Sequence, residues 1–304
     1  MMQTYSHGGA VPAGGAIATV VAGSATAAIG GIIYAYAFRW IPIVYVNFII
    51  TLVFGGAMGY VVCAQAQRGK IRNNTFVCVT AFLVGLLGLY VYWAAYLWAL
   101  AGIRNVGLWA FWPPVLVGFG QHLFEKGSWG LKGDTVTGWI LVGVWVIEAG
   151  TVLWFAVSTA LGESRRPFCE SCHEWTEIEP GVARLVATGD EPAWQQVLAG
   201  DLPSLAEFPA ASPGVQQFVR LDAARCPKCE HSRFLTVSAV QVTIDKKGNA
   251  KETERRLISN AVLRPGQFAV VEACGQLYRQ AQSGPVDDEP EDVTEPPAPA
   301  DEGA

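Results

Sequence analysis

The chain has 304 residues, of which 51% are hydrophobic and only 15% are charged, and it carries a net charge of −5 at pH 7. Charged residues make up about a quarter of a typical soluble domain, so this composition excludes a protein that is soluble throughout. Residues 163–282 hold 14 Lys and Arg against 15 Asp and Glu. Because this part has no basic surplus to bind a phosphate backbone, we expect no nucleic-acid partner.

The first half of the chain is dominated by apolar segments. Residues 1–15 are rich in glycine and predict a disordered N-terminus. Four apolar segments follow, each long enough to cross a bilayer as a helix: residues 17–38, 41–64, 76–102 and 136–161. The sequence therefore predicts a four-helix transmembrane domain over residues 16–162.

Small residues recur at helical spacing within the first two segments. Gly23, Ala27 and Gly31 fall four residues apart, and so do Gly55 and Gly59. Such spacing lets a second helix approach closely. We therefore expect these faces to be packing faces.

Residues 103–135, between the third and fourth segments, are too short to span. Pro113 and Pro114 can begin a helix and Gly127 can end it, which predicts a short amphipathic helix at the membrane interface. His122 lies on this helix. We interpret it as an ordinary interfacial histidine rather than a metal or proton ligand.

The orientation follows from the basic residues. Arg68, Lys70 and Arg72 lie in one short loop, and Arg165 and Arg166 follow the fourth segment on the same side. The opposite side holds Arg39, Arg104, Lys126 and Lys132. The denser side predicts a multi-pass protein of the cell (inner) membrane with both termini in the cytoplasm.

Glu148 is the one charged residue of the fourth segment and lies near its middle. An ionised acid at that depth costs about 2.5–3.5 kcal/mol on insertion scales, so it needs a partner, a hydrated cavity or a proton. One interpretation is a hydrogen-bonded glutamate that joins helices, with Asn47 or a tyrosine of the third segment as partner. The other is an intramembrane proton or ion site.

The second half has the pattern of a small α+β domain over residues 163–282. Asp190 and Asp201 are each placed to cap a short helix. Residues 218–223 and 234–244 predict strands, residues 251–258 a returning strand, and residues 267–282 a helix. The last segment, 283–304, holds eight acids and no base, and it predicts a disordered acidic tail.

Four of the seven cysteines form two closely spaced pairs, Cys169 with Cys172 and Cys226 with Cys229. Two residues between thiolates let one tight turn aim both at one ion, and two such turns supply the four sulfurs of a tetrahedral Zn²⁺ site. The sequence thus predicts one structural zinc ion per chain. The other cysteines, Cys63, Cys78 and Cys274, are interpreted as packing residues.

Other readings of the pairs remain open. Cys169, Cys172 and His173 match the c-type haem attachment pattern, and each pair is compatible with redox chemistry or a disulfide. His173 and His231 each follow a pair and could replace a cysteine as ligand. The 53 residues between the pairs also exceed the spacing of a compact zinc ribbon, so the spacing permits a joint site without requiring it.

Several segments together carry a family resemblance. They are IPIVYVNF at the start of the second apolar segment, RGKIRN after it, and SW…TGWILVGVWVIEA, which leads into the fourth. With the two cysteine pairs, the chain resembles uncharacterised bacterial four-span membrane proteins that end in a cytoplasmic zinc-ribbon-like domain. The resemblance implies this architecture and no activity.

Two functions of different classes are compatible with this reading. The first is a membrane-anchored scaffold that presents a structural-zinc domain to a cytoplasmic protein partner. The second is an oligomeric transporter or channel subunit with Glu148 as its ion site and the zinc domain as its regulator. The sequence holds no phosphate-binding loop, HExxH motif or nucleophile elbow, so an enzyme is not expected.

Overall fold

The computed structural model describes residues 2–41, 43–127, 130–131, 134–162, 166–187, 192–212, 214–229, 231–245 and 249–282. The predictions for Lys132, Arg165, the Asp190 cap and the tail 283–304 lie outside these residues. The chain divides into a helical unit, residues 6–175, and a sheet unit, which consists of residues up to Tyr5 together with those from Thr176 onward. Each unit is described by itself.

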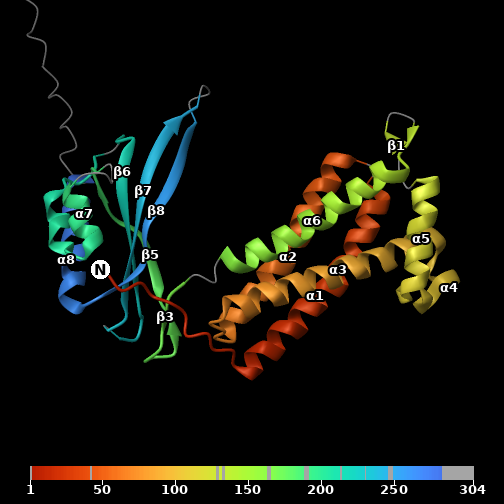
Figure 1. Cartoon of the computed structure of the whole chain (residues 1–304), viewed down its shortest axis with the longest axis horizontal. Coiled ribbons are helices and arrows are strands. Elements are labelled where there is room, and N and C mark those ends of the chain that lie inside the picture. Colours follow the sequence, from red (N-terminus) through yellow and green to blue (C-terminus); the bar gives the residue numbers. More distant parts are fainter. Residues whose placement is uncertain are drawn as a thin grey trace, which may run out of the picture. The chain divides into compact units, whose positions relative to one another are not determined.

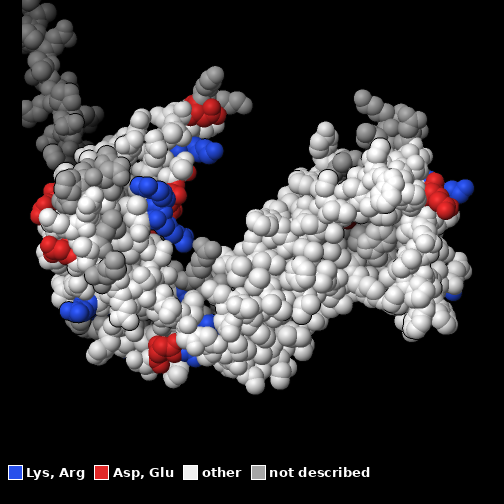
Figure 2. Space-filling model, viewed as in Figure 1, with Lys and Arg blue, Asp and Glu red and all other residues white. Residues whose placement is uncertain are grey.

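Four long helices make up most of the helical unit (Figure 1). They are α1 (Ala13–Trp40), α2 (Val44–Arg68), α3 (Asn74–Ala101) and α6 (Gly138–Gly162). All four are long and apolar enough to cross a membrane, as the sequence predicts. On the face in Figure 2, their surface is uncharged over most of its length.

Small residues bring these helices into backbone contact. A Cβ atom at Gly31 of α1 would lie 2.9 Å from the Gly88 oxygen in α3. One at Gly55 of α2 would lie 2.6 Å from the Val152 oxygen in α6, and one at Gly59 would overlap the Ala156 oxygen. The predicted close-approach faces of the first and second helices are therefore confirmed.

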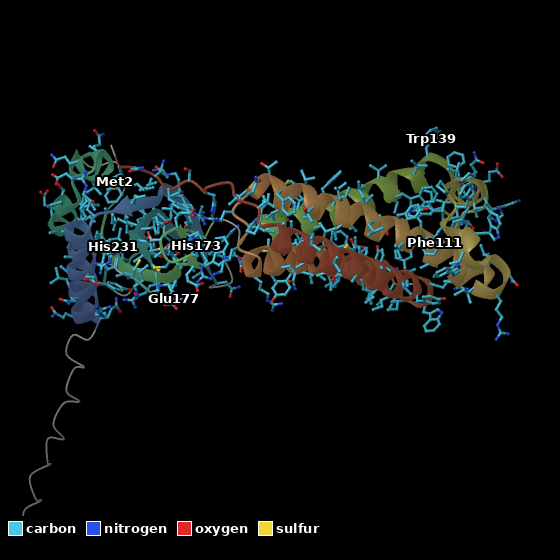
Figure 3. All side chains as sticks on the ribbon, turned by 90° about the horizontal axis from the view of Figure 1, so that it is seen from below. Met2, Phe111, Trp139, His173, Glu177 and His231 are labelled. Atoms are coloured by element: carbon cyan, nitrogen blue, oxygen red, sulfur yellow. The ribbon has the colours of Figure 1, made fainter. Side chains whose placement is uncertain are left out.

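Short elements connect α3 to α6. They are α4 (Ile103–Val106), the 3-10 helix η1 (Gly107–Phe111), α5 (Pro113–Lys126), β1 (Gly130–Leu131) and β2 (Asp134–Thr135). The predicted short helix is confirmed as α5, which ends at Gly127 in a left-handed conformation (φ 79°). Trp109 and Trp139 are 70% and 80% exposed in this region, and Figure 3 shows Phe111 and Trp139 at the same end of the helical unit.

The sheet unit contains four antiparallel strands in the order β5-β6-β7-β8. They are β5 (Glu177–Leu185), β6 (Gln217–Arg225), β7 (Arg233–Ile244) and β8 (Ala250–Leu263). Alternate residues of β6, such as Val219 and Leu221, join one core with Phe268 and Val271 of α8 (Pro265–Gln282). Figure 1 shows α7 (Pro192–Ala199) on the same side of the sheet as α8. The three predicted strands and the last helix are confirmed.

Two features of this unit differ from the sequence analysis. Strand β5 was not expected, because Pro180 and Gly181 interrupt its pattern; the sheet accommodates them with a register shift between Glu179 and Ala183. The second short helix is the 3-10 helix η2 (Leu202–Glu207), and Asp201 does not cap its backbone. Asp201 Oδ2 instead accepts a hydrogen bond from the Ser204 hydroxyl at 3.1 Å.

The N-terminal segment, expected to be disordered over residues 1–15, has a defined place. Its first residues add to the free edge of β8: Thr4 bridges Ala261, and the Tyr5 N–H donates to the Asn260 oxygen at 2.9 Å. The Tyr5 ring packs edge-on against Phe234, with the ring centroids 5.1 Å apart. Helix α1 then begins at Ala13. Glycine content alone does not reveal this pairing, since its stabilisation comes from the distant strand.

Candidate metal centre and a carboxyl group buried among the helices

The first cysteine pair lies on a small hairpin. Strands β3 (Phe168–Cys169) and β4 (Glu174–Trp175) pair antiparallel, and the turn between them carries Cys172. His173, directly after Cys172, adopts a left-handed conformation with φ 52°. Such a conformation costs a residue with a Cβ atom about 1–2 kcal/mol, so the surroundings must hold the turn.

The second pair lies where β6 turns into β7. The Cys226 N–H donates to the Ser232 oxygen at 3.0 Å, which closes the turn. The Lys228 N–H lies 3.4 Å from Cys226 Sγ and donates to it. A backbone donor aimed at sulfur favours the thiolate, which is the form that binds metal.

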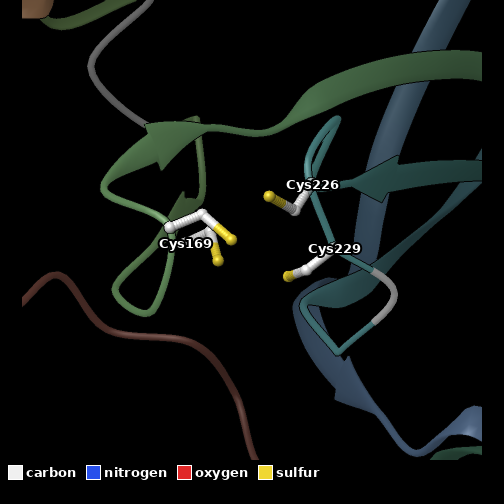
Figure 4. Close-up of side chains that lie close together, drawn as sticks. Cys169, Cys226 and Cys229 are labelled. Carbon is white, nitrogen blue, oxygen red and sulfur yellow. The ribbon is translucent and has the colours of Figure 1, made fainter.

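The structure brings the two pairs together. The Sγ atoms of Cys169, Cys172, Cys226 and Cys229 all lie within 4.8 Å of one another, and Figure 4 shows the sulfurs directed toward a common space. Tetrahedral Zn²⁺ with Zn–S bonds of about 2.3 Å needs sulfurs about 3.8 Å apart, so small side-chain shifts would close the cluster on one ion. The group that could hold a metal consists of these four cysteines and includes neither His173 nor His231.

This arrangement bears on the other readings of the pairs. All seven cysteines are free thiols. Haem attachment through Cys169 and Cys172 would leave the converging second pair without a role, as would a separate redox pair. A set of four thiols around one point is best suited to a tetrahedral metal ion.

The loop between α2 and α3 holds the first hairpin. Trp175 Nε1 donates to the Gln67 oxygen at 2.8 Å, and Lys70 Nζ donates to the His173 oxygen at 2.6 Å. Arg72 pairs with Glu170. In the sequence, Lys70 and Arg72 indicate only the orientation of the chain, because the partners in these contacts lie about 100 residues away.

Glu148 is the predicted intramembrane polar residue, and three helices surround it. Its Oε1 lies 2.6 Å from the Tyr34 hydroxyl of α1, and that hydroxyl lies 2.7 Å from Thr51 Oγ1 of α2. Thr51 Oγ1 lies 2.9 Å from the backbone oxygen of Asn47. Glu148 therefore hydrogen-bonds to Tyr34 of α1, which was not predicted, and to Tyr92, a tyrosine of the third helix as one interpretation proposed. Asn47, the other proposed partner, is linked to the carboxyl group only through Thr51 and Tyr34.

A small cavity adjoins this carboxyl group. Tyr92, Tyr96 and Trp145 line it together with Glu148, and its volume of about 10 Å³ admits the centre of about one water molecule. Tyr34 was missed from the sequence, although it lies three residues after Gly31 on the small-residue face of α1. That spacing is the signal that could have found it.

His122, the other polar candidate of the first half, is exposed on α5.

No protein-family model, curated protein or solved structure matches the chain. The resemblance to four-span membrane proteins with a zinc-ribbon-like domain therefore stays a prediction, and the function must be argued from the residues of this chain alone.

Proposed function

We propose that α1, α2, α3 and α6 span the inner membrane and that the chain after α6, which carries all four cysteines, is a cytoplasmic interaction module folded around one zinc ion. The observation that carries this proposal is the cluster of four cysteine Sγ atoms within 4.8 Å. A Zn²⁺ ion with four thiolate ligands has no open position for substrate. Such an ion stabilises a fold, and its binding free energy becomes folding free energy.

The chain connections support a location of the start of α1 and the end of α6 on the same side of the membrane. Residues 3–5 pair with β8 in the sheet unit, and α1 begins only at Ala13. Helix α6 ends at Gly162, a few residues before the first hairpin. Four spans return the chain to the side on which it started, which is compatible with both connections to the sheet unit.

Photo-crosslinking in cells tests the interaction role. A crosslinking amino acid at Ile244, which is 64% exposed on β7, should form an adduct with one soluble protein. The adduct should disappear in Cys226→Ser, because loss of the metal unfolds the module. The matched control is the same crosslinker at Trp139, 80% exposed in the helical unit, where no soluble protein should be captured. Adducts limited to lipids or to second copies of this chain would contradict the proposal.

A fusion test checks the orientation. A reporter that is active only in the cytoplasm should be active after Ala304 and inactive when inserted next to Lys126, at the end of α5. The opposite pattern would place the sheet unit outside the cytoplasm, where a four-thiol zinc site is not expected because thiols there oxidise to disulfides.

The transporter or channel role is the second candidate. It is favoured by the partly buried Glu148 and its hydrogen-bonded neighbours on α1 and α2. Four spans are few for a transporter, so this role would require several copies of the chain around a common pathway.

A further inference from the structure

Glu148 hydrogen-bonds to Tyr92 of α3 and also begins a chain of oxygen atoms. It runs from the carboxyl group to the Tyr34 hydroxyl, then to the Thr51 hydroxyl and then to the backbone oxygen of Asn47, with steps of 2.6, 2.7 and 2.9 Å. Each step is at hydrogen-bond distance, so each needs one proton. The number of protons available therefore depends on the state of the carboxyl group.

An ionised Glu148 leaves this chain one proton short. The two hydroxyl groups supply two protons for three contacts, since a carboxylate and a backbone carbonyl only accept. If Tyr34 donates to Glu148 and Thr51 donates to Tyr34, then Thr51 and the Asn47 oxygen are two acceptors facing each other at 2.9 Å. Two oxygen atoms at this distance repel each other when no proton lies between them.

A neutral Glu148 satisfies every step. The carboxylic acid donates to Tyr34, Tyr34 donates to Thr51, and Thr51 donates to the Asn47 oxygen. We propose that Glu148 is a proton-binding site and that its carboxyl group is protonated in this structure. Thr51 and Tyr34 relay the proton to it. The two patterns interconvert when one proton enters at Thr51: the Thr51 proton moves to Tyr34, the Tyr34 proton moves to the carboxylate, and both hydroxyl groups are regenerated.

The surroundings of Glu148 fit a neutral acid. The polar groups that face it are hydroxyls: Tyr34 from α1, Tyr92 and Tyr96 from α3, and Thr51 of α2 through Tyr34. Helix α5 contributes Leu123 and α6 itself contributes Trp145. Among the described residues, no lysine, arginine or histidine forms an ion pair with Glu148. An ionised carboxylate would thus stand without a compensating charge.

The relay opens toward one end of the helices only. By helical rise, Glu148 lies about 15 Å from the start of α6, whereas Asn47 lies about 5 Å from the start of α2 at the same end. The side-chain oxygen of Asn47 is buried and has no hydrogen-bond partner among the described residues, so it can accept from an entering water. Toward the α2–α3 loop, buried apolar residues such as Phe54 and Met58 follow.

Infrared spectroscopy of the full chain in detergent tests the protonation state. The difference spectrum between wild type and Glu148→Gln should contain the carbonyl band of a carboxylic acid at neutral pH, and this band should shift in D₂O. The control is Glu125→Gln, an exposed acid of α5, which should change carboxylate bands only. Carboxylate bands alone for Glu148 would overturn the proposal.

The relay and its direction are tested in liposomes that hold the protein in one orientation. This step rests on the membrane location proposed above, and failure of the protein to float with liposomes would reject that location while leaving the detergent result intact. A pH jump on the side of the α1–α2 connection should change the Glu148 band, and Tyr34→Phe should slow this response about 100-fold or more, the usual loss when a positioned proton-transfer group is removed.

The matched control is Tyr36→Phe, on the same helix, which should respond like wild type. Equal rates in Tyr34→Phe and wild type would reject the relay. A response only to pH on the side of the α2–α3 loop would reject its direction.

Discussion

The guanidinium carbon of Arg72 lies 4.6 Å from the centroid of the ring of Phe168, the residue directly before the first cysteine of the candidate metal site. The same arginine pairs with Glu170, which is half exposed. It therefore ties the α2–α3 loop to the hairpin that supplies two of the four thiols. The hairpin has only two residues in each strand and depends on such contacts.

Arg72→Ala should loosen this hairpin. The lost cation–π contact and ion pair are together worth about 1–2 kcal/mol, since the exposed acid contributes little. The expected result is faster proteolysis between residues 166 and 175 and faster loss of metal to a chelator. Arg72→Lys should restore only part of the effect because lysine stacks poorly on a ring. Arg68→Ala, in the same loop, serves as the control, and an equal effect there would contradict the specific role of Arg72.

Metal content should follow the four cysteines as a unit. The purified full chain should hold about one zinc ion, and either Cys172→Ser or Cys226→Ser should abolish binding and the cooperative melting of the sheet unit. Cys78→Ser, a change on α3 away from the cluster, should leave both unchanged. Elemental analysis and calorimetry measure these outcomes. If one of the two variants kept full metal and a cooperative melt, the shared site would be rejected.

Gly59→Val should disrupt the contact between α2 and α6. A Cβ atom at this position would overlap the backbone oxygen of Ala156, which cannot move without shifting the helix. Overpacking of this kind costs about 1–3 kcal/mol, and a rigid backbone neighbour places it at the upper end. Gly56→Ala is the control, because its nearest neighbour, Thr159 Oγ1, lies at 3.9 Å. Equal melting temperatures for the two variants in detergent would contradict the close packing.

The sheet unit should lose stability in acid partly through Glu254. The Ser238 hydroxyl donates to Glu254 at 2.7 Å and the Arg220 guanidinium pairs with it at 2.9 Å, and together they lower its pKa. A folded-state pKa below the unfolded value gives stability that is present above the unfolded pKa, about 4.3 for glutamate, and is lost as the pH falls through the folded pKa.

Glu254→Gln should therefore lose less stability than wild type when the pH falls from about 6 to about 3, which spans the ordinary glutamate pKa. The effect should be modest because the side chain is about one-third exposed. Melting curves across this range measure it, with Glu252→Gln on the same strand as control. A parallel loss of stability in wild type and Glu254→Gln would show that the hydrogen bonds do not stabilise the ionised form.

The sequence was informative where one physical effect dominates locally. Apolar length predicted the four long helices, glycine spacing predicted the contacts of Gly31 and Gly59, and two thiols per turn predicted that Cys169 and Cys226 belong together. The apolar segments and the glycine spacing can each be recognised within a single helix. The two cysteine pairs match the four thiolate ligands of known zinc sites. The sequence could therefore name the residues of the candidate metal site before their distances were known.

The features that the sequence missed all depend on distant partners. Strand β5 carries Pro180 and Gly181, which argue against a strand until β6 is present to pair with it. Arg72 looked like a sign of orientation because Glu170 lies far along the chain. The position of Tyr34 on the small-residue face of α1 indicates packing against another helix, but Glu148, which its hydroxyl contacts, lies 114 residues further along the chain. In each case the stabilisation comes from a contact between residues widely separated in sequence, which periodicity does not encode.

The pairing of residues 3–5 with β8 sets a condition on the order of folding. Residues 3–5 are synthesised before the four long helices, whereas their partners Asn260 and Val262 are synthesised after them. This edge of β8 can therefore pair only after the helices have been made. The pairing closes a loop of about 250 residues, which is slow because its ends must find each other. A fragment that starts after the helices would expose this edge of β8 and the ring of Phe234, and it should aggregate more readily than the full chain.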